Sequence, residues 1–176
     1  TVGADGDFNG GSATFVGWNW LGGTTSGITT NGSTTITPSA YSFNQTSGFS
    51  VLSYTGNSTS GAKLAHGLGV APEMVFIKNL GTLNDWVTYS KYVKSTDPED
   101  WVMRLNNTSI AVDDVAMWND TQPDSVNITL GNAGNLNTGY SYIAYCFAPV
   151  KGYSKFGSYT GNGNADGTFV YTGFRP

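Results

Sequence analysis

The chain has 176 residues, of which only 11% are charged and 14% are aromatic, so it is long enough and apolar enough to form one domain with its own core. This composition excludes a disordered chain, because disordered chains are rich in charge and poor in aromatic residues. A net charge of −4, with only 8 Lys and Arg residues, argues against a nucleic-acid partner, and no apolar run is long enough for insertion into a membrane.

Short segments rich in β-branched and aromatic residues recur along the chain, separated by Gly, Asn, Asp or Pro. These segments predict strands at residues 14–20, 49–55, 74–78, 86–89, 101–105, 126–130 and 140–148. Regular short strands of this kind are typical of an antiparallel β-sandwich or jelly roll, so we expect an all-β fold.

The remaining segments predict connections. Residues 97–100 fit either one helical turn or a loop, and we favour the loop. Residues 1–12 and 21–47 are rich in Gly, Ser, Thr and Asn, so we expect a linker and an extended Gly/Thr-rich arm.

The core should be built from the apolar residues of the predicted strands. We expect it to contain Val51, Leu52, Val75, Ile77, Val87, Val102, Leu105, Val126, Ile128, Leu130, Ile143 and Phe147.

Parts of the sequence repeat. Residues 48–57 recur as residues 152–162 with one inserted residue, and both copies contain Tyr-Thr-Gly-Asn. Residues 66–72 are loosely repeated at 172–176, and residues 14–20 resemble residues 141–147. Together with a first residue that is Thr1 and not Met, this pattern predicts a slice of a longer modular protein. We expect three parts, namely the end of a preceding unit with a linker or arm (1–47), a central β-sandwich unit (48–150) and the start of a following repeat (151–176).

Several phrases of the sequence resemble a repeated β-domain of large structural proteins from marine and aquatic tailed bacteriophages. The phrases lie at residues 15–20, 48–57, 66–79, 118–120 and 142–147. The resemblance implies a role in virion structure or host attachment, often near the tail fibre, and it implies no catalytic residues.

Two single residues invite a chemical interpretation. Cys146 is the only cysteine and lies in an apolar strand, so we expect a buried thiol that packs as a small hydrophobic group. His66 is the only histidine. A zinc site needs three or four ligands and a catalytic base needs partners, so we expect a hydrogen-bonded structural histidine.

Acidic residues suggest two further kinds of site. Residues 97–100, 113–114 and 119–120 could offer oxygen ligands to calcium, although none has the spacing of an EF-hand loop. We therefore expect no cofactor, with calcium as the alternative. Glu73 and Glu99 are candidates for the paired carboxylates of a glycosidase, but the sequence alone does not place them together, and we expect no enzyme.

Exposed aromatic rings beside Asn and Asp side chains would suit a sugar, because the ring stacks on the apolar face of the sugar and the polar groups bind its hydroxyls. The alternative is that the rings belong to the core. The candidate glycan contacts are Trp86, Tyr89, Trp118, Asn119 and Asp120.

These observations favour a virion or extracellular structural protein of the tail-fibre or surface-fibre type. Its expected partners are copies of itself, other virion proteins and a host-surface glycan. The alternatives are a non-viral secreted adhesin or carbohydrate-binding module and, third, a polysaccharide-degrading enzyme.

Overall fold

The structure is a computed structural model that describes residues 6–17 and 19–175. Its strands are β1 (Ala40–Asn44), β2 (Phe49–Thr55), β3 (Ala62–Ala65), β4 (Met74–Asn79), β5 (Val87–Ser90), β6 (Trp101–Arg104), β7 (Val112–Asp113), β8 (Asn127–Leu130) and β9 (Ser141–Phe147). Three short helices complete the fold: α1 (Gly6–Asn9), the 3₁₀ turn η1 (Pro98–Asp100) and α2 (Val115–Trp118). The predicted all-β fold is confirmed. The segment at 97–100 forms the helical turn and not the loop that we favoured.

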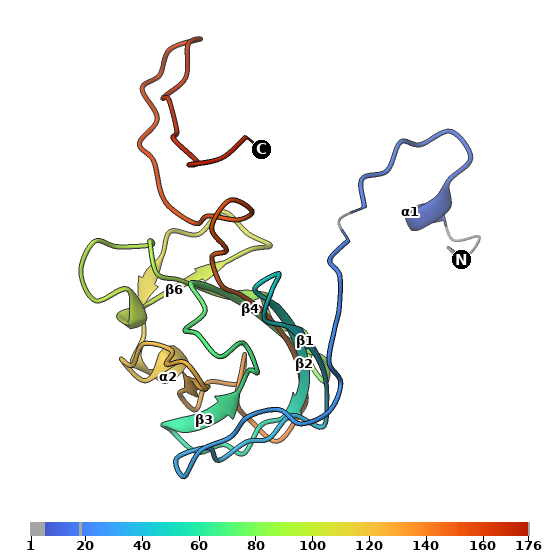
Figure 1. Cartoon of the computed structure of the whole chain (residues 1–176), viewed down its shortest axis with the longest axis vertical. Coiled ribbons are helices and arrows are strands. Elements are labelled where there is room, and N and C mark those ends of the chain that lie inside the picture. Colours follow the sequence, from blue (N-terminus) through green and yellow to red (C-terminus); the bar gives the residue numbers. More distant parts are fainter. Residues whose placement is uncertain (1–5, 18, 176) are drawn as a thin grey trace.

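The strands form two antiparallel layers (Figure 1). The larger layer is a curved sheet with the order β1-β2-β9-β4-β5-β6-β7, and the smaller layer is the pair β3-β8. β9 is the last strand in the described residues, yet it lies inside the large sheet, third in its order, between β2 and β4. A single core fills the space between the two layers and α2.

Strand alternation decides which side chains enter this core. In β9, Tyr142, Ala144 and Cys146 are buried, while Ile143 and Phe147 point to the opposite face of the sheet, here called the outer face, and are half-buried. Of the predicted core residues, those confirmed as buried are Leu52, Val75, Ile77, Val87, Val102, Ile128 and Leu130.

The core prediction was wrong for the remaining residues for two reasons. Val51 lies on the outer face with Ile143 and Phe147, because it pairs with Tyr145 in the β2-β9 ladder. Leu105 and Val126 lie just beyond the ends of β6 and β8, where Leu105 is 61% exposed and Val126 is half-buried.

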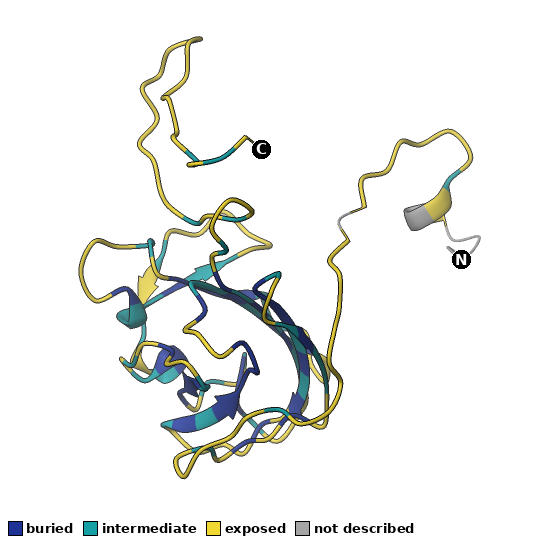
Figure 2. Cartoon of the chain, in the orientation of Figure 1, coloured by how far each residue is buried: buried dark blue, intermediate teal, exposed yellow. Residues whose placement is uncertain are grey.

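The arm predicted at residues 21–47 is shorter than expected. Ile36 and Phe43 are buried, and β1 pairs with β2 from Ala40 to Asn44, so the packed unit begins before residue 48. Tyr41 and Phe43 alternate within a Ser-rich segment, which was enough to add an edge strand despite the polar composition. Residues 21–27 and 155–175 are mostly exposed (Figure 2). Within the described residues, no helix is long and apolar enough to cross a membrane.

Cys146 and His66 have the structural roles that we expected. Cys146 is fully buried, and burial raises the pKa of its thiol well above the usual range, which makes the thiolate rare. His66 is also fully buried, and its Nδ1 accepts a hydrogen bond from the backbone N–H of Leu68 at 3.2 Å. Its Nε2 therefore carries the proton and donates to the carbonyl oxygen of Asp124 at 3.0 Å.

This environment predicts that acid destabilises the unit. Burial lowers the pKa of His66 below its ordinary value of 6.5, against the smaller opposing effect of the Asp124 carbonyl and carboxylate. Below pH 6.5 the unfolded chain binds more protons at this site, so the free energy of unfolding should fall as the pH drops from 7 to 5, by at most about 1.4 kcal/mol per pH unit. Urea unfolding across this range measures the slope. In His66→Gln the slope should be flatter, and an unchanged slope would assign it to other groups.

Candidate functional site

One corner of the unit is built around α2. The Asp114 side chain caps the helix by accepting a hydrogen bond from the Ala116 N–H at 3.0 Å, and Asn119 ends it in the left-handed conformation with φ 54°. Gly131 lies directly against this helix, because its N–H donates to the Met117 carbonyl at 2.5 Å. The corner is therefore fixed to the end of β8.

This geometry corrects two predicted glycan contacts. Trp118 and Tyr89 are each only 1% exposed, and their rings meet edge to face with centroids 5.8 Å apart. Trp118 lies on the buried side of α2, and Tyr89 lies on the inner face of β5, so neither ring can stack on a sugar. Of this predicted group, Asn119 is half-buried and Asp120 is exposed.

The three predicted acidic segments meet at the same corner. Desolvation raises the pKa of Asp100, and the carboxylates of Asp120, Asp97, Asp113 and Glu99 raise it further. In the described part of the chain, however, no three or more His, Cys, Asp or Glu side chains form a group that could hold a metal ion. The corner is thus a region of concentrated negative charge.

The two glutamates considered for catalysis have different surroundings. Glu73 forms an ion pair with Lys91 at 2.9 Å and accepts a hydrogen bond from the Tyr92 hydroxyl at 2.9 Å. Glu99 has a buried oxygen, Oε2, with no hydrogen-bond partner among the described residues. Because Glu73 is held by a cation and a hydroxyl, its carboxylate is already occupied by structural contacts.

Of the three aromatic residues among the predicted contacts, Trp86 is half-buried and lies next to a polar hollow. Trp86 directly precedes Val87, which pairs with Ile77 at the end of the β4-β5 ladder. The Trp86 ring faces Tyr145 with centroids 6.2 Å apart and an interplanar angle of 31°. Together the two rings form an aromatic platform on the outer face of the sheet.

The hollow beside this platform has a volume of about 350 Å³. Its lining consists of Lys78, Leu83, Asn84, Asp85, Asn106 and Asn135.

A chain of contacts fixes the polar groups of the hollow. Asn106 accepts a hydrogen bond from the Trp86 backbone N–H at 2.9 Å and donates to Asp85 Oδ1 at 2.9 Å. Arg104 Nε lies 3.1 Å from Asp85 Oδ2, so the carboxylate is held from both sides. Fixed amide and carboxylate groups beside an aromatic platform can bind the hydroxyls and the apolar face of a sugar. We call these residues, with Trp86 and Tyr145, the Trp86 site.

Sequence reasoning found Trp86 but missed Tyr145, Asn106 and Lys78. The alternation of residues 141–147 places Tyr145 on the face opposite Tyr142, but both faces carry aromatic residues, so the pattern did not show which face was exposed. The contact between Asn106 and Trp86 depends on the loop that joins β6 to β7, for which the sequence carries no signal.

The whole chain, residues 1–176, matches the family model described as "Domain of unknown function (DUF7483)". The chain belongs to this family. Comparisons with curated proteins and with solved structures find no match.

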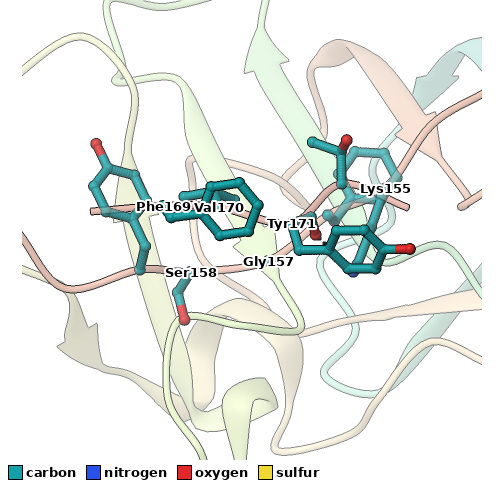
Figure 3. Close-up of a pocket in the computed structure, with 9 residues that line it drawn as sticks. Lys155, Gly157, Ser158, Phe169, Val170 and Tyr171 are labelled. Carbon is teal, nitrogen blue, oxygen red and sulfur yellow. Dashed lines mark hydrogen bonds between the residues drawn. The ribbon is translucent and has the colours of Figure 1, made fainter. Parts of the chain in front are cut away.

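The chain also has a groove outside the packed unit. We call residues 152–175 the C-terminal arm. The groove lies between two segments of this arm, the legs at residues 155–159 and 169–172, and has a volume of about 370 Å³. Figure 3 shows Phe169 and Tyr171 on one leg and Lys155 and Ser158 on the other. Lys155 Nζ donates to the Tyr171 carbonyl at 3.1 Å and lies 5.5 Å from the centre of its ring. The Thr168 hydroxyl also donates to the Thr160 carbonyl at 2.7 Å. Tyr159, Phe169 and Tyr171 are 71%, 84% and 72% exposed, so the arm presents aromatic side chains to the outside.

Proposed function

We propose that this protein is a structural module of a virion surface fibre, of the tail-fibre type, that assembles with copies of itself and presents a glycan-binding surface to the host. The observation that carries the proposal is the second copy of the β2 sequence. Residues 152–162 repeat residues 48–57, yet the position of β2 between β1 and β9 is already filled. A chain that carries strand sequence beyond the needs of its own unit is typical of modular arrays.

Assembly tests the structural part of this proposal. Light scattering after size exclusion, with electron microscopy of the same fractions, should show elongated oligomers whose mass rises with protein concentration. A monomer at every concentration would contradict the proposal.

The Trp86 site favours the attachment part and, as a second candidate function, a carbohydrate-binding module that acts without a virion. Both functions require a glycan at this site, so a glycan array tests the feature they share. Detection of the protein in purified virus particles would then favour the virion module over the carbohydrate-binding module that acts without a virion.

Replacing Trp86 by alanine removes half of the aromatic platform. For a glycan found on the array, we expect an affinity about tenfold weaker, equivalent to about 1.4 kcal/mol. Calorimetric titration with that glycan measures the change.

Trp101 supplies a matched control, because it is also half-buried but its ring is covered by Lys94, whose Nζ lies 4.1 Å from the ring centre. Trp101→Ala should leave the glycan affinity unchanged. Equal losses in the two variants would remove the Trp86 site from the proposal.

The third alternative is hydrolysis of a polysaccharide. Release of reducing ends that is lost in both Glu73→Gln and Glu99→Gln would replace the present proposal with an enzymatic one.

A further inference from the structure

We propose that the N-terminal residues 13–17 of one copy of this chain pair with residues 157–160 in the C-terminal arm of a second copy. The pair would be antiparallel and would reproduce the β2-β9 ladder of the packed unit. This inference rests on the proposed self-assembly and names the surfaces that carry it.

The C-terminal arm supplies the β2 side of the pair. Its residues Ser158, Tyr159 and Thr160 correspond to Ser53, Tyr54 and Thr55 of β2. Tyr54 is 1% exposed in the core, whereas Tyr159 is 71% exposed. The arm therefore has the sequence of a central strand and the exposure of an unpaired one.

The inserted residue does not disturb this correspondence. Residues Phe156 and Gly157 stand where β2 has Leu52 alone. One extra residue in a strand is accommodated as a β-bulge, after which the alternation of side chains returns to the same phase.

The N-terminal residues supply the β9 side. Thr14, Phe15 and Val16 correspond to Ser141, Tyr142 and Ile143. Tyr142 is fully buried, whereas Phe15 is 46% exposed and Val16 is 79% exposed. Residues 13–17 belong to no strand in the structure as described.

The packed unit shows which residues would meet. Tyr54 is paired with Tyr142 in the ladder, and their rings stack with centroids 5.2 Å apart and an interplanar angle of 18°. The corresponding residues are Tyr159 and Phe15, the two exposed rings. In the same register Ser158 lies opposite Val16 and Thr160 opposite Thr14, as Ser53 lies opposite Ile143 and Thr55 opposite Ser141.

We choose a second copy as the partner because, within the described residues, the chain's own surfaces do not offer these positions. Within the unit, β2 and β9 already occupy the two places. The N-terminal segment and the C-terminal arm also leave the unit in separate directions and do not lie beside each other (Figure 1). Two different surfaces that bind each other form a heterologous contact, which generates rings or open filaments. In a filament built in this way, each packed unit would be linked to the next by one pairing of residues 13–17 with residues 157–160.

Cysteine pairing tests the register. The full chain is prepared as Cys146→Ala/Val16→Cys and separately as Cys146→Ala/Ser158→Cys, and the two are mixed and oxidised mildly. We expect a disulfide-linked heterodimer in the mixture, because paired strands bring these positions within the roughly 7 Å between Cα atoms that a disulfide requires.

The matched control replaces Ser158→Cys by Asn164→Cys, at an exposed position beyond the proposed ladder. We expect about tenfold less heterodimer with this control, since its Cα lies outside the disulfide distance in the proposed register. Equal yields would overturn the register.

A chain that carries both Val16→Cys and Ser158→Cys distinguishes pairing between copies from pairing within one chain. Linked dimers and larger species support the proposal, whereas a cross-linked monomer overturns it. If the unmodified chain assembles but the cysteines do not link above the control, this inference fails and the proposed function stands. If the unmodified chain stays monomeric at every concentration, both fail.

Discussion

Trp118→Ala is expected to lower the free energy of unfolding by about 3–5 kcal/mol, the range for deleting a large buried aromatic side chain. The ring is almost fully buried, and it joins α2 to β5 through its edge-to-face contact with Tyr89. Urea unfolding followed by fluorescence and circular dichroism measures the loss.

Trp118→Phe provides the comparison. A phenyl ring keeps part of the contact with Tyr89, and it removes Nε1, which is buried with no hydrogen-bond partner among the described residues. The loss for Phe should therefore be clearly smaller than the loss for Ala. Similar losses for the two variants would show that the ring contact contributes little.

The second large effect concerns Gly131. A Cβ atom added at this position would lie 2.0 Å from the Ala116 carbonyl oxygen and 2.3 Å from the carbonyl carbon. Both atoms belong to the backbone of α2, so the helix itself would have to move. That movement would disturb the bonds from the Gly131 and Ala133 N–H groups to the Met117 and Ala116 carbonyls.

We therefore expect Gly131→Ala to destabilise the unit by about 3 kcal/mol or more, at the upper end of the range for overpacking. Gly139 in the following loop is the control, because no atom outside its chain neighbours lies within 4 Å of a Cβ built there. Gly139→Ala should stay within about 0.5 kcal/mol of the parent chain in the same thermal or urea experiment. Equal stability of the two variants would mean that α2 moves at little cost.

The sequence predicted the fold class because most strands can be recognised from their own residues and the turns that flank them. Residues 49–55 and 74–78 combine β-branched and aromatic residues with clear turns, and both lie in the large sheet. β1 was missed because Tyr41 and Phe43 are embedded in Ser and Asn, so the composition suggested an arm. Composition averages over the whole segment, whereas two correctly spaced rings are enough to add an edge strand in which Phe43 is buried.

The segment 14–20 shows the opposite failure. Its pattern predicts a strand, but the described residues of this segment form none, because the corresponding place in the sheet is taken by β9. A strand needs a ladder partner as well as a suitable pattern, and the partner is not encoded in the segment itself.

The candidate site was predictable only in part. Trp118 seemed suited to a surface because Asn119 and Asp120 follow it, but those residues end the helix while the ring turns into the core. Trp86 could be named because it is an aromatic residue of the central unit, near Tyr89 in the sequence. Its partners Tyr145 and Asn106 come from distant strands and loops, so only the sheet order brings them together.

The internal position of β9 has a consequence for how the chain acquires its structure. Phe49 pairs with Phe147, so the neighbouring strands β2 and β9 join residues from opposite ends of the unit. Until β9 is synthesised and pairs, the sheet consists of two separate parts, the pair β1-β2 and the four strands β4 to β7. Each part has an edge strand whose backbone N–H and C=O groups lack their β9 partners. Synthesis on the ribosome must therefore pass residue 147 before the sheet can close, and long-range pairings of this kind place folding in the millisecond-to-second range. During that interval the exposed edges are vulnerable to wrong pairing with neighbouring nascent chains.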